Sequence, residues 1–156
     1  MNELKEKKPE GGYKITKLVL IESNFKRAKS VSLDPSLPKN QAVNIDVDCQ
    51  LDENKVFVTE TLTYKQQGAK GVEIAASIKM LGVFEVYGTI PVPLEEFGRV
   101  NGAAIIFPYI RETLTSLCAK ASVGLVILPP FNFVKRNLES KALVTNTPTK
   151  PKKIKK

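Results

Sequence analysis

Three segments between residues 42 and 88 combine strand-forming composition with very short connections, and they constrain the fold most. "AVNIDVDCQLD" places apolar side chains at alternate positions from Val43 to Leu51, which is the period of a strand with one solvated face. "KVFVTETLTYKQQ" is rich in β-branched and aromatic residues. "VEIAASIKMLGVFEVYG" is long enough for one bent strand, in which we expect Gly82 to mark a bulge or bend. The short turns "DEN" and "QGAKG" predict an antiparallel meander.

The remaining segments extend this meander to an α+β domain. "YKITKLVLI" predicts a strand over 13–22, followed by the proline-containing loop "RAKSVSLDPSLPKNQ". Residues 92–101 predict one or two helical turns, and 101–121 predict a long amphipathic helix that Gly124 terminates. "VKRNLESKALV" predicts a short final helix. We therefore expect a four-stranded antiparallel sheet followed by a long helix and a short C-terminal helix on one face.

Two segments carry prolines in unusual places. Pro108 lies inside the predicted long helix, where it removes a backbone donor and leaves the Ala104 carbonyl without its helical partner. "LVILPPFNFV" is strongly apolar, and its two prolines exclude an ordinary central strand. This segment either packs on the sheet or forms a rigid apolar wall of a binding groove.

The composition excludes several classes of function. The chain has no histidine, which removes the commonest general base and metal ligand, and two cysteines cannot form a structural zinc site. No phosphate-binding or nucleophile motif is present, so we expect neither an enzyme nor a metal or other cofactor. We expect Cys49 and Cys118 to be packing residues rather than a disulfide. Without a signal-peptide pattern or a long apolar run, the expected location is the cytoplasm.

The net charge of +8 is unevenly distributed. The last ten residues, "TPTKPKKIKK", contain five lysines and no acid, so the rest of the chain carries about +3. Such a tail either solubilises the protein or contacts nucleic acid, anionic lipid or an acidic protein. A nucleic-acid-binding module is an alternative function, but aromatic residues make up only 7% of the chain and no base-stacking signature is present. We divide the chain into a disordered arm (1–12), a folded domain (13–140) and a basic disordered tail (141–156).

Two motifs resemble those of the SecB family of protein-export chaperones. "IIFPYIRETLTSL" resembles the family's "LFPYARE" element, through Phe107, Pro108, Tyr109, Arg111 and Glu112. "LVILPPFNF" resembles its later loop, which ends in proline, any residue, asparagine and phenylalanine. "YKITKLVLIESNFKR" and "GVFEVYG" also resemble strands of that family. The similarity spans roughly residues 13–137.

This resemblance implies an ATP-independent holdase that binds unfolded polypeptides and keeps preproteins competent for export. The alternative is a chaperone dedicated to one partner, such as an antitoxin. The resemblance also implies a homotetramer, a dimer of dimers. The residues that we expect to bind polypeptide are apolar and come from two segments: Phe84, Tyr87, Val126, Ile127, Leu128, Phe131 and Phe133. The expected oligomer interface is one helix face: Phe107, Ile110, Leu114 and Leu117.

The family docks the translocase motor SecA through acidic residues on the sheet. The corresponding positions here are Glu22, Lys26, Ala75 and Ser77. Because only the first of these is acidic, the sequence predicts weak or absent binding to SecA.

Overall fold

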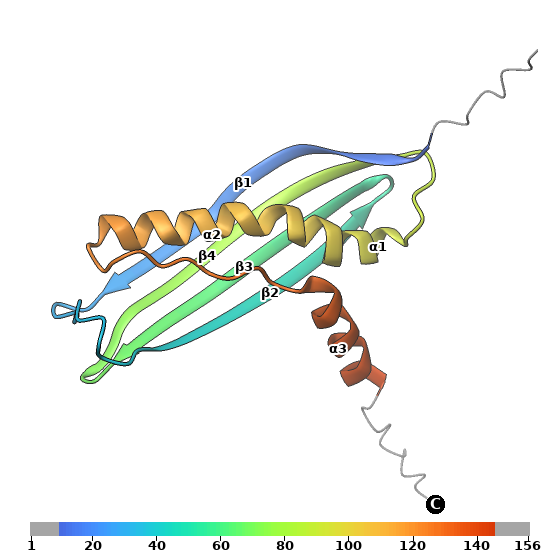
Figure 1. Ribbon diagram of the computed structural model, residues 1–156. Helices are drawn as coiled ribbons and strands as arrows, with labels where there is room; N and C mark the ends of the chain where they lie inside the picture. The colour runs from blue at the N-terminus through green and yellow to red at the C-terminus, as the bar shows by residue number, and fades with distance from the viewer. Residues whose placement is uncertain (1–9, 146–156) are drawn as a thin grey trace, which may run out of the picture.

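The computed structural model describes residues 10–145 as an α+β fold with one sheet and helices on one of its faces (Figure 1). The strands are β1 (Gly12–Arg27), β2 (Asn40–Asp52), β3 (Lys55–Gly68) and β4 (Gly71–Tyr87). Their order in the sheet is β1-β4-β3-β2, and every neighbouring pair is antiparallel. The predicted meander is thus confirmed, and β1 pairs with β4 at one edge.

Strand β1 is longer than the sequence pattern predicts. It pairs with β4 from Gly12 opposite Tyr87 to Arg27 opposite Ile74, whereas apolar alternation predicts a strand only over 13–22. Its last residues are mainly polar and exposed, because an edge strand on a solvated face needs no apolar pattern to keep its backbone hydrogen bonds. Two register shifts, after Ile15 and after Leu20, let β1 follow the twist of the sheet.

Gly82 is not a bulge, so this expectation was wrong. It lies in regular register between Leu18 of β1 and Val58 of β3. A Cβ atom there would lie 2.7 Å from Cδ1 of Ile106, which is far inside contact distance. The glycine is needed because a helix passes close over the strand, not because the strand bends.

One continuous helical stretch crosses the inner face of the sheet. It consists of α1 (Leu94–Phe97), a π-helical turn η1 (Gly98–Gly102) and α2 (Ala103–Lys120). A Cβ on Gly98 would lie 2.4 Å from Sγ of Cys49, so the glycine permits close approach of η1 to β2. The turns predicted over 92–101 and the predicted long helix therefore form one element.

Helix α2 continues through Pro108 without interruption. Both Pro108 and Ala104 are exposed, so the carbonyl that proline leaves without a helical partner lies on the solvated side of the helix. The helix ends at Lys120, and the chain then turns through Ser122 (φ 53°) and Gly124 (φ 89°). This confirms the predicted stop near Gly124.

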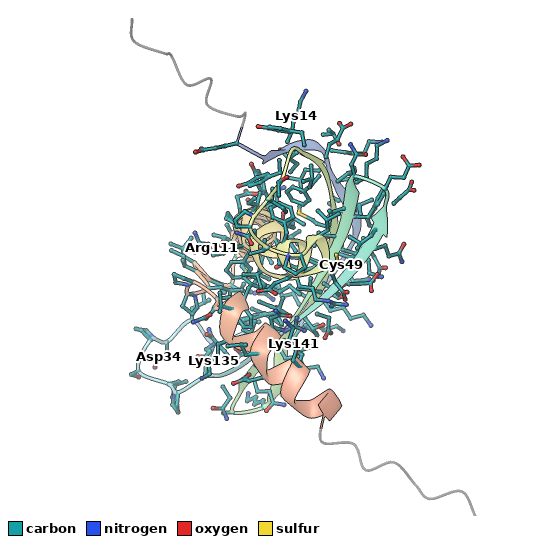
Figure 2. All side chains as sticks on the ribbon, turned by 90° about the vertical axis from the view of Figure 1, so that its right-hand side faces the viewer. Lys14, Asp34, Cys49, Arg111, Lys135 and Lys141 are labelled. Atoms are coloured by element: carbon teal, nitrogen blue, oxygen red, sulfur yellow. The ribbon has the colours of Figure 1, made fainter. Side chains whose placement is uncertain are left out.

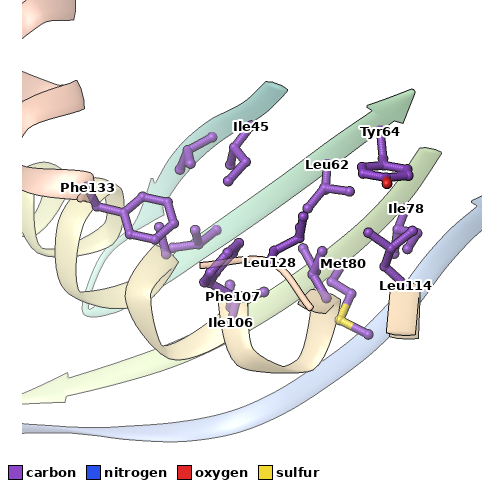
Figure 3. Packing of buried hydrophobic residues seen from close by; sticks show 14 of the residues in the cluster. Ile45, Leu62, Tyr64, Ile78, Met80, Ile106, Phe107, Leu114, Leu128 and Phe133 are labelled. Carbon is purple, nitrogen blue, oxygen red and sulfur yellow. The ribbon is translucent and has the colours of Figure 1, made fainter. Parts of the chain in front are cut away.

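The core lies between the inner face of the sheet and α2 (Figure 3). Leu62, Ile78 and Leu114 are fully buried there, together with the Cys118 thiol. Cys49 is half-buried and both cysteines are free, as expected for packing residues. Figure 2 shows the helices on one side of the sheet, while the other face carries only its own side chains.

The last described element is α3 (Phe133–Thr145), which follows the irregular segment 121–132. It runs past residue 140, where we expect the folded domain to end. Residues 1–9 of the expected N-terminal arm and 146–156 of the expected tail lie outside the described residues. The three-part division of the chain therefore stays a prediction.

Candidate functional site

The segment between α2 and α3 is extended and alternates between buried and exposed side chains. Val126 and Leu128 are buried against the core, whereas Leu125 and Ile127 are 72% and 65% exposed. The Thr115 hydroxyl of α2 donates a hydrogen bond to the Val126 carbonyl at 2.6 Å, which fixes the segment alongside the helix. Because Pro129 and Pro130 have no N–H, the segment forms no strand. Both interpretations of its sequence therefore hold, since one set of side chains packs inward and the other is presented outward.

The two sequence motifs meet in an aromatic cluster. The Phe107 ring of α2 lies 6.3 Å from that of Phe131 and 5.8 Å from that of Phe133, between ring centroids. Phe131 and Phe133 are 4.9 Å apart, and the Arg111 guanidinium lies 6.0 Å from the Phe107 centroid. Figure 3 shows Phe133 over Phe107 and Leu128. The cluster joins the start of α3 to α2.

Asn132 begins α3. Its Oδ1 accepts a hydrogen bond from the backbone N–H of Lys135 at 2.9 Å, as expected for an N-cap residue. The proline-any-residue-asparagine-phenylalanine motif thus ends an extended segment, caps a helix and supplies that helix's buried anchor, Phe133.

Two concave surfaces flank α3. One, of about 700 Å³, separates it from α1 and η1 and is lined by Pro93, Glu95, Glu96, Arg99, Phe133, Arg136, Asn137, Ser140 and Lys141. The other, of about 370 Å³, lies between α3 and the edge of β2 and includes Val43, Ile45 and Phe131. Arg136 lines both. We call these two surfaces, together with the exposed side chains of 125–131, the α3 groove.

The predicted polypeptide-binding residues do not form one surface. Phe84 is fully buried, with its ring 5.7 Å from Phe97 and 6.3 Å from Tyr13, under the start of the helical stretch. Its expected place in a client site was wrong, because the inner face of β4 is covered by the chain's own helix. Tyr87 is exposed but lies at the end of β4, opposite Gly12.

The other five predicted residues remain together beside α2. Ile127 and Phe131 are exposed, whereas Val126, Leu128 and Phe133 form the buried side of the same segment. This segment is where an apolar ligand would meet the chain.

Comparison with known proteins identifies the family. Residues 19–141 match the family described as SecB, preprotein translocase subunit SecB. The chain belongs to the SecB family.

Its SecB relatives differ in how much of the chain they match. Protein-export protein SecB of Hahella chejuensis is 28% identical over 136 residues, or 85% of either chain. That of Alcanivorax borkumensis is 34% identical over 85 residues, or 53% of this chain and 52% of its own. An uncharacterised protein of Methanocaldococcus jannaschii is 32% identical over 95 residues, or 58% of this chain and 61% of its own. The chain thus spans less than two thirds of the last two relatives.

A solved structure shows the same fold. It is a SecB-like chaperone of Mycobacterium tuberculosis in complex with a ChAD peptide from the HigA1 antitoxin. The TM-score is 0.66 at 14% sequence identity, over 77% of this chain and 91% of the other. The antiparallel sheet with a long and a short C-terminal helix is therefore a SecB-like architecture.

The positions corresponding to the SecB motor-docking site lie together on the outer face of the sheet. Lys26 of β1 is directly opposite Ala75 of β4, and Glu22 is opposite Lys79. Ser77 lies opposite Asn24, between these two pairs. On β3, Lys65 is the other neighbour of Ala75. The cluster that the sequence predicts thus exists, and lysines stand on both sides of Ala75.

The helix face that we expect between SecB subunits packs instead on the chain's own sheet. Phe107 is 5% exposed, and Ile110 and Leu114 are fully buried within one chain, while Leu117 is partly buried against the same cluster. The placement was wrong because the apolar periodicity of a helix shows which face is covered but not what covers it.

Sequence reasoning missed a buried carboxyl group on β3. The inward positions of this strand run Val56, Val58, Glu60, Leu62 and Tyr64, so the same alternation that predicts the strand places Glu60 on the apolar face. The residue is fully buried, and burial raises the pKa of Glu60 to about 8, an effect that the charge of Arg136 partly opposes.

A second buried polar group, Glu73, has partners. It accepts hydrogen bonds from Lys39 at 2.5 Å, from Gln66 at 3.1 Å and from the Ser32 backbone at 3.2 Å. The bond from Lys39 is the largest cause of the lowered pKa of Glu73. This network holds the loop between β1 and β2 on the sheet, and we assign it a structural role.

Proposed function

We propose that this SecB-family protein is an ATP-independent chaperone that binds non-native polypeptides in the α3 groove, without catalysis. One observation carries the proposal: apolar side chains stay exposed on a segment that prolines and Thr115 hold rigid. An exposed apolar surface with a fixed backbone binds other chains without paying the entropy of ordering itself. Preproteins awaiting export are the proposed clients, in the cytoplasm. None of the described helices is long and apolar enough to span a membrane, and the described residues hold no cluster of metal-ligating side chains.

The test is suppression of aggregation of a denatured protein. The double variant Ile127→Ser/Phe131→Ser should suppress aggregation several-fold less at equal concentration, because it removes the exposed apolar side chains and leaves the buried ones. Leu33→Ser is the matched control, since Leu33 is 65% exposed, as is Ile127, but lies in the loop between β1 and β2. A folded wild-type protein that suppresses no aggregation would refute the proposal.

A chaperone dedicated to one client is the second candidate. A specific observation favours it: the related M. tuberculosis chaperone was solved with a peptide from an antitoxin. Recovery of one dominant protein in a native pull-down supports this candidate, whereas recovery of many preproteins supports general export.

We propose that docking to SecA is weak. Lys26 and Lys65 flank Ala75 on the outer face, so a basic partner would meet like charge there. Titration calorimetry at two salt concentrations tests this, with Lys26→Glu/Ser77→Glu as the variant expected to gain affinity. Tight binding by the wild type would show that other residues dock the motor.

We propose a homotetramer whose subunits meet at β1 rather than at the buried face of α2. Strand β1 is an edge strand, and Ile15, Leu20 and Ile21 are each 40% or more exposed. Such an edge pairs readily with a second chain. Ile21→Asp should lower the mass measured by light scattering without unfolding the chain, and an unchanged mass would refute this placement.

A further inference from the structure

Glu60 is an anomaly in an otherwise satisfied core. Neither carboxyl oxygen has a hydrogen-bond partner among the described residues, and the side chain is 0% exposed. Burying a polar group without a partner costs free energy that an apolar residue at the same position would not. The position therefore sacrifices stability, and a role in binding would account for the sacrifice.

The surroundings of Glu60 locate it beneath the α3 groove. Its neighbours across the sheet are Val47 on β2 and Met80 on β4. Arg99 of η1 donates a hydrogen bond to the Val47 carbonyl at 3.0 Å. Arg136 of α3 is the basic residue whose charge acts on the Glu60 carboxyl. Because Arg99 and Arg136 both line the larger concave surface, Glu60 lies under its floor.

Both arginines already have other acceptors. Arg99 also contacts Glu95 at 3.1 Å, and Arg136 contacts Asp46, which points to the outer side of β2, at 3.4 Å. The residues of α2 nearest this part of the sheet, Ala103 and Phe107, are apolar. A cation that pairs with Glu60 must therefore come from a bound molecule or replace an existing interaction of an arginine.

The cover over Glu60 is removable. Helix α3 has one buried aromatic anchor, Phe133, and its printed ion pairs to the rest of the chain, with Asp46 and Glu96, are solvent-exposed. Exposed ion pairs contribute little to stability. Displacement of α3 would open the floor of the groove without disturbing the sheet or α2.

We propose that Glu60 is a specificity-determining residue, which pairs with a lysine or arginine side chain of a bound polypeptide once α3 has moved aside. This inference rests on the chaperone function proposed above. It defines the preferred client segment as apolar residues around one basic residue. The exposed apolar side chains of 125–131 bind the former, and Glu60 selects the latter.

Pairing changes the protonation of Glu60. Burial holds this carboxyl group protonated near neutral pH in the free protein. When a cationic side chain arrives, the O–H bond of the carboxyl breaks, the proton passes to the solvent buffer and the carboxylate pairs with the cation. Binding of a basic client therefore releases close to one proton per site, whereas binding of a neutral client releases none.

The experiment uses two unstructured peptides of leucine and serine that differ at one central position, lysine or methionine. Their binding to the full chain is measured by calorimetry at neutral pH, in phosphate and in Tris, whose different ionisation enthalpies reveal proton release. The wild type should bind the lysine peptide about tenfold more tightly and release a proton. Glu60→Gln and Glu60→Leu, each checked for fold by circular dichroism, should bind both peptides alike and release none.

The outcomes separate this inference from the proposed function. If the wild type binds neither peptide, the chaperone proposal fails. If it binds both equally without proton release, only the selection by Glu60 fails. Glu96→Gln, a change on the rim of the same groove, tests the remaining explanation: loss of the lysine preference there, with preference retained in Glu60→Gln, would assign selectivity to the rim and overturn the inference.

Discussion

Helices α2 and α3 follow one another in the chain but are held by different forces. Helix α2 buries side chains along its whole length against the sheet, and its C-terminal end is tied to β1 by a hydrogen bond from Arg27 to the Ala121 carbonyl at 2.7 Å. Helix α3 has Phe133 and a set of exposed ion pairs. Hydrophobic burial contributes roughly 1.5–3 kcal/mol per large side chain, whereas an exposed ion pair contributes about 0–1 kcal/mol. We therefore regard α2 as scaffold and α3 as the movable part of the groove.

The largest test of this contrast places the same charge in each helix. Leu114→Asp should destabilise the protein by about 4 kcal/mol or more, because it buries an unpaired carboxylate against the sheet. Leu138→Asp should change stability by less than about 0.5 kcal/mol, since Leu138 of α3 is 61% exposed. Denaturant unfolding followed by circular dichroism measures both. A folded, stable Leu114→Asp protein would contradict the burial of this helix face within one chain.

The second test removes the anchor of α3. Phe133→Ala should cost about 3 kcal/mol, since it deletes a buried ring from the aromatic cluster. The loss should be local: hydrogen exchange should accelerate throughout α3 while β3 and β4 keep their protection. Val134→Ala is the control, because Val134 is exposed on the same turn. Equal loss of protection in the sheet would show that α3 is part of the scaffold.

The same contrast explains what the sequence could predict. Alternation is a local signal, so strands β2, β3 and β4, and the segment 125–131, follow from it. The location of β1 at the edge beside β4 depends on contacts between distant residues, and no local pattern specifies it. Periodicity also predicts that Leu114 is covered, but it does not distinguish the chain's own sheet from a second subunit.

The candidate site was predictable in part for similar reasons. Two motifs close in sequence, around Phe107 and Phe133, predict the segment that joins them, and the structure brings both into one cluster. Phe84 is an apolar strand residue like many others, and only the path of the helix over it shows that it is buried. Glu60 could have been recognised, because the face of β3 that it occupies is otherwise apolar.

The third test concerns the floor of the groove and is pH-dependent. The pKa of Glu60 is raised from 4.5 to about 8, so the native state binds more protons than the unfolded chain between these values. Stability is therefore highest below the ordinary pKa and falls as the pH rises toward 8. Glu60→Gln should remove this slope and be more stable than the wild type by about 2 kcal/mol in mildly alkaline buffer.

Unfolding midpoints in urea at acidic, neutral and mildly alkaline pH measure the effect of Glu60→Gln. Glu53→Gln serves as the control, because Glu53 lies in the exposed turn between β2 and β3. Wild-type and Glu60→Gln profiles that run parallel over the whole range would show that the carboxyl group has water or another group as its partner.

The smallest expected effect comes from the ion pair between Arg136 and Asp46. Because Asp46 is 70% exposed and the two groups are 3.4 Å apart, the pair should contribute about 0.5 kcal/mol, which is too little to shift global unfolding clearly. If α3 opens independently of the sheet, however, the same energy should accelerate hydrogen exchange of α3 about twofold in Asp46→Asn and leave that of α2 unchanged. High salt should abolish the difference, because screening weakens the pair in the wild type as well. Asp48→Asn is the matched control: it removes a charge from the same face of β2, where Asp48 accepts a hydrogen bond from Gln50. Acceleration of exchange in both helices by Asp46→Asn would show that α2 and α3 open as one unit, and the distinction between scaffold and movable cover would then fail.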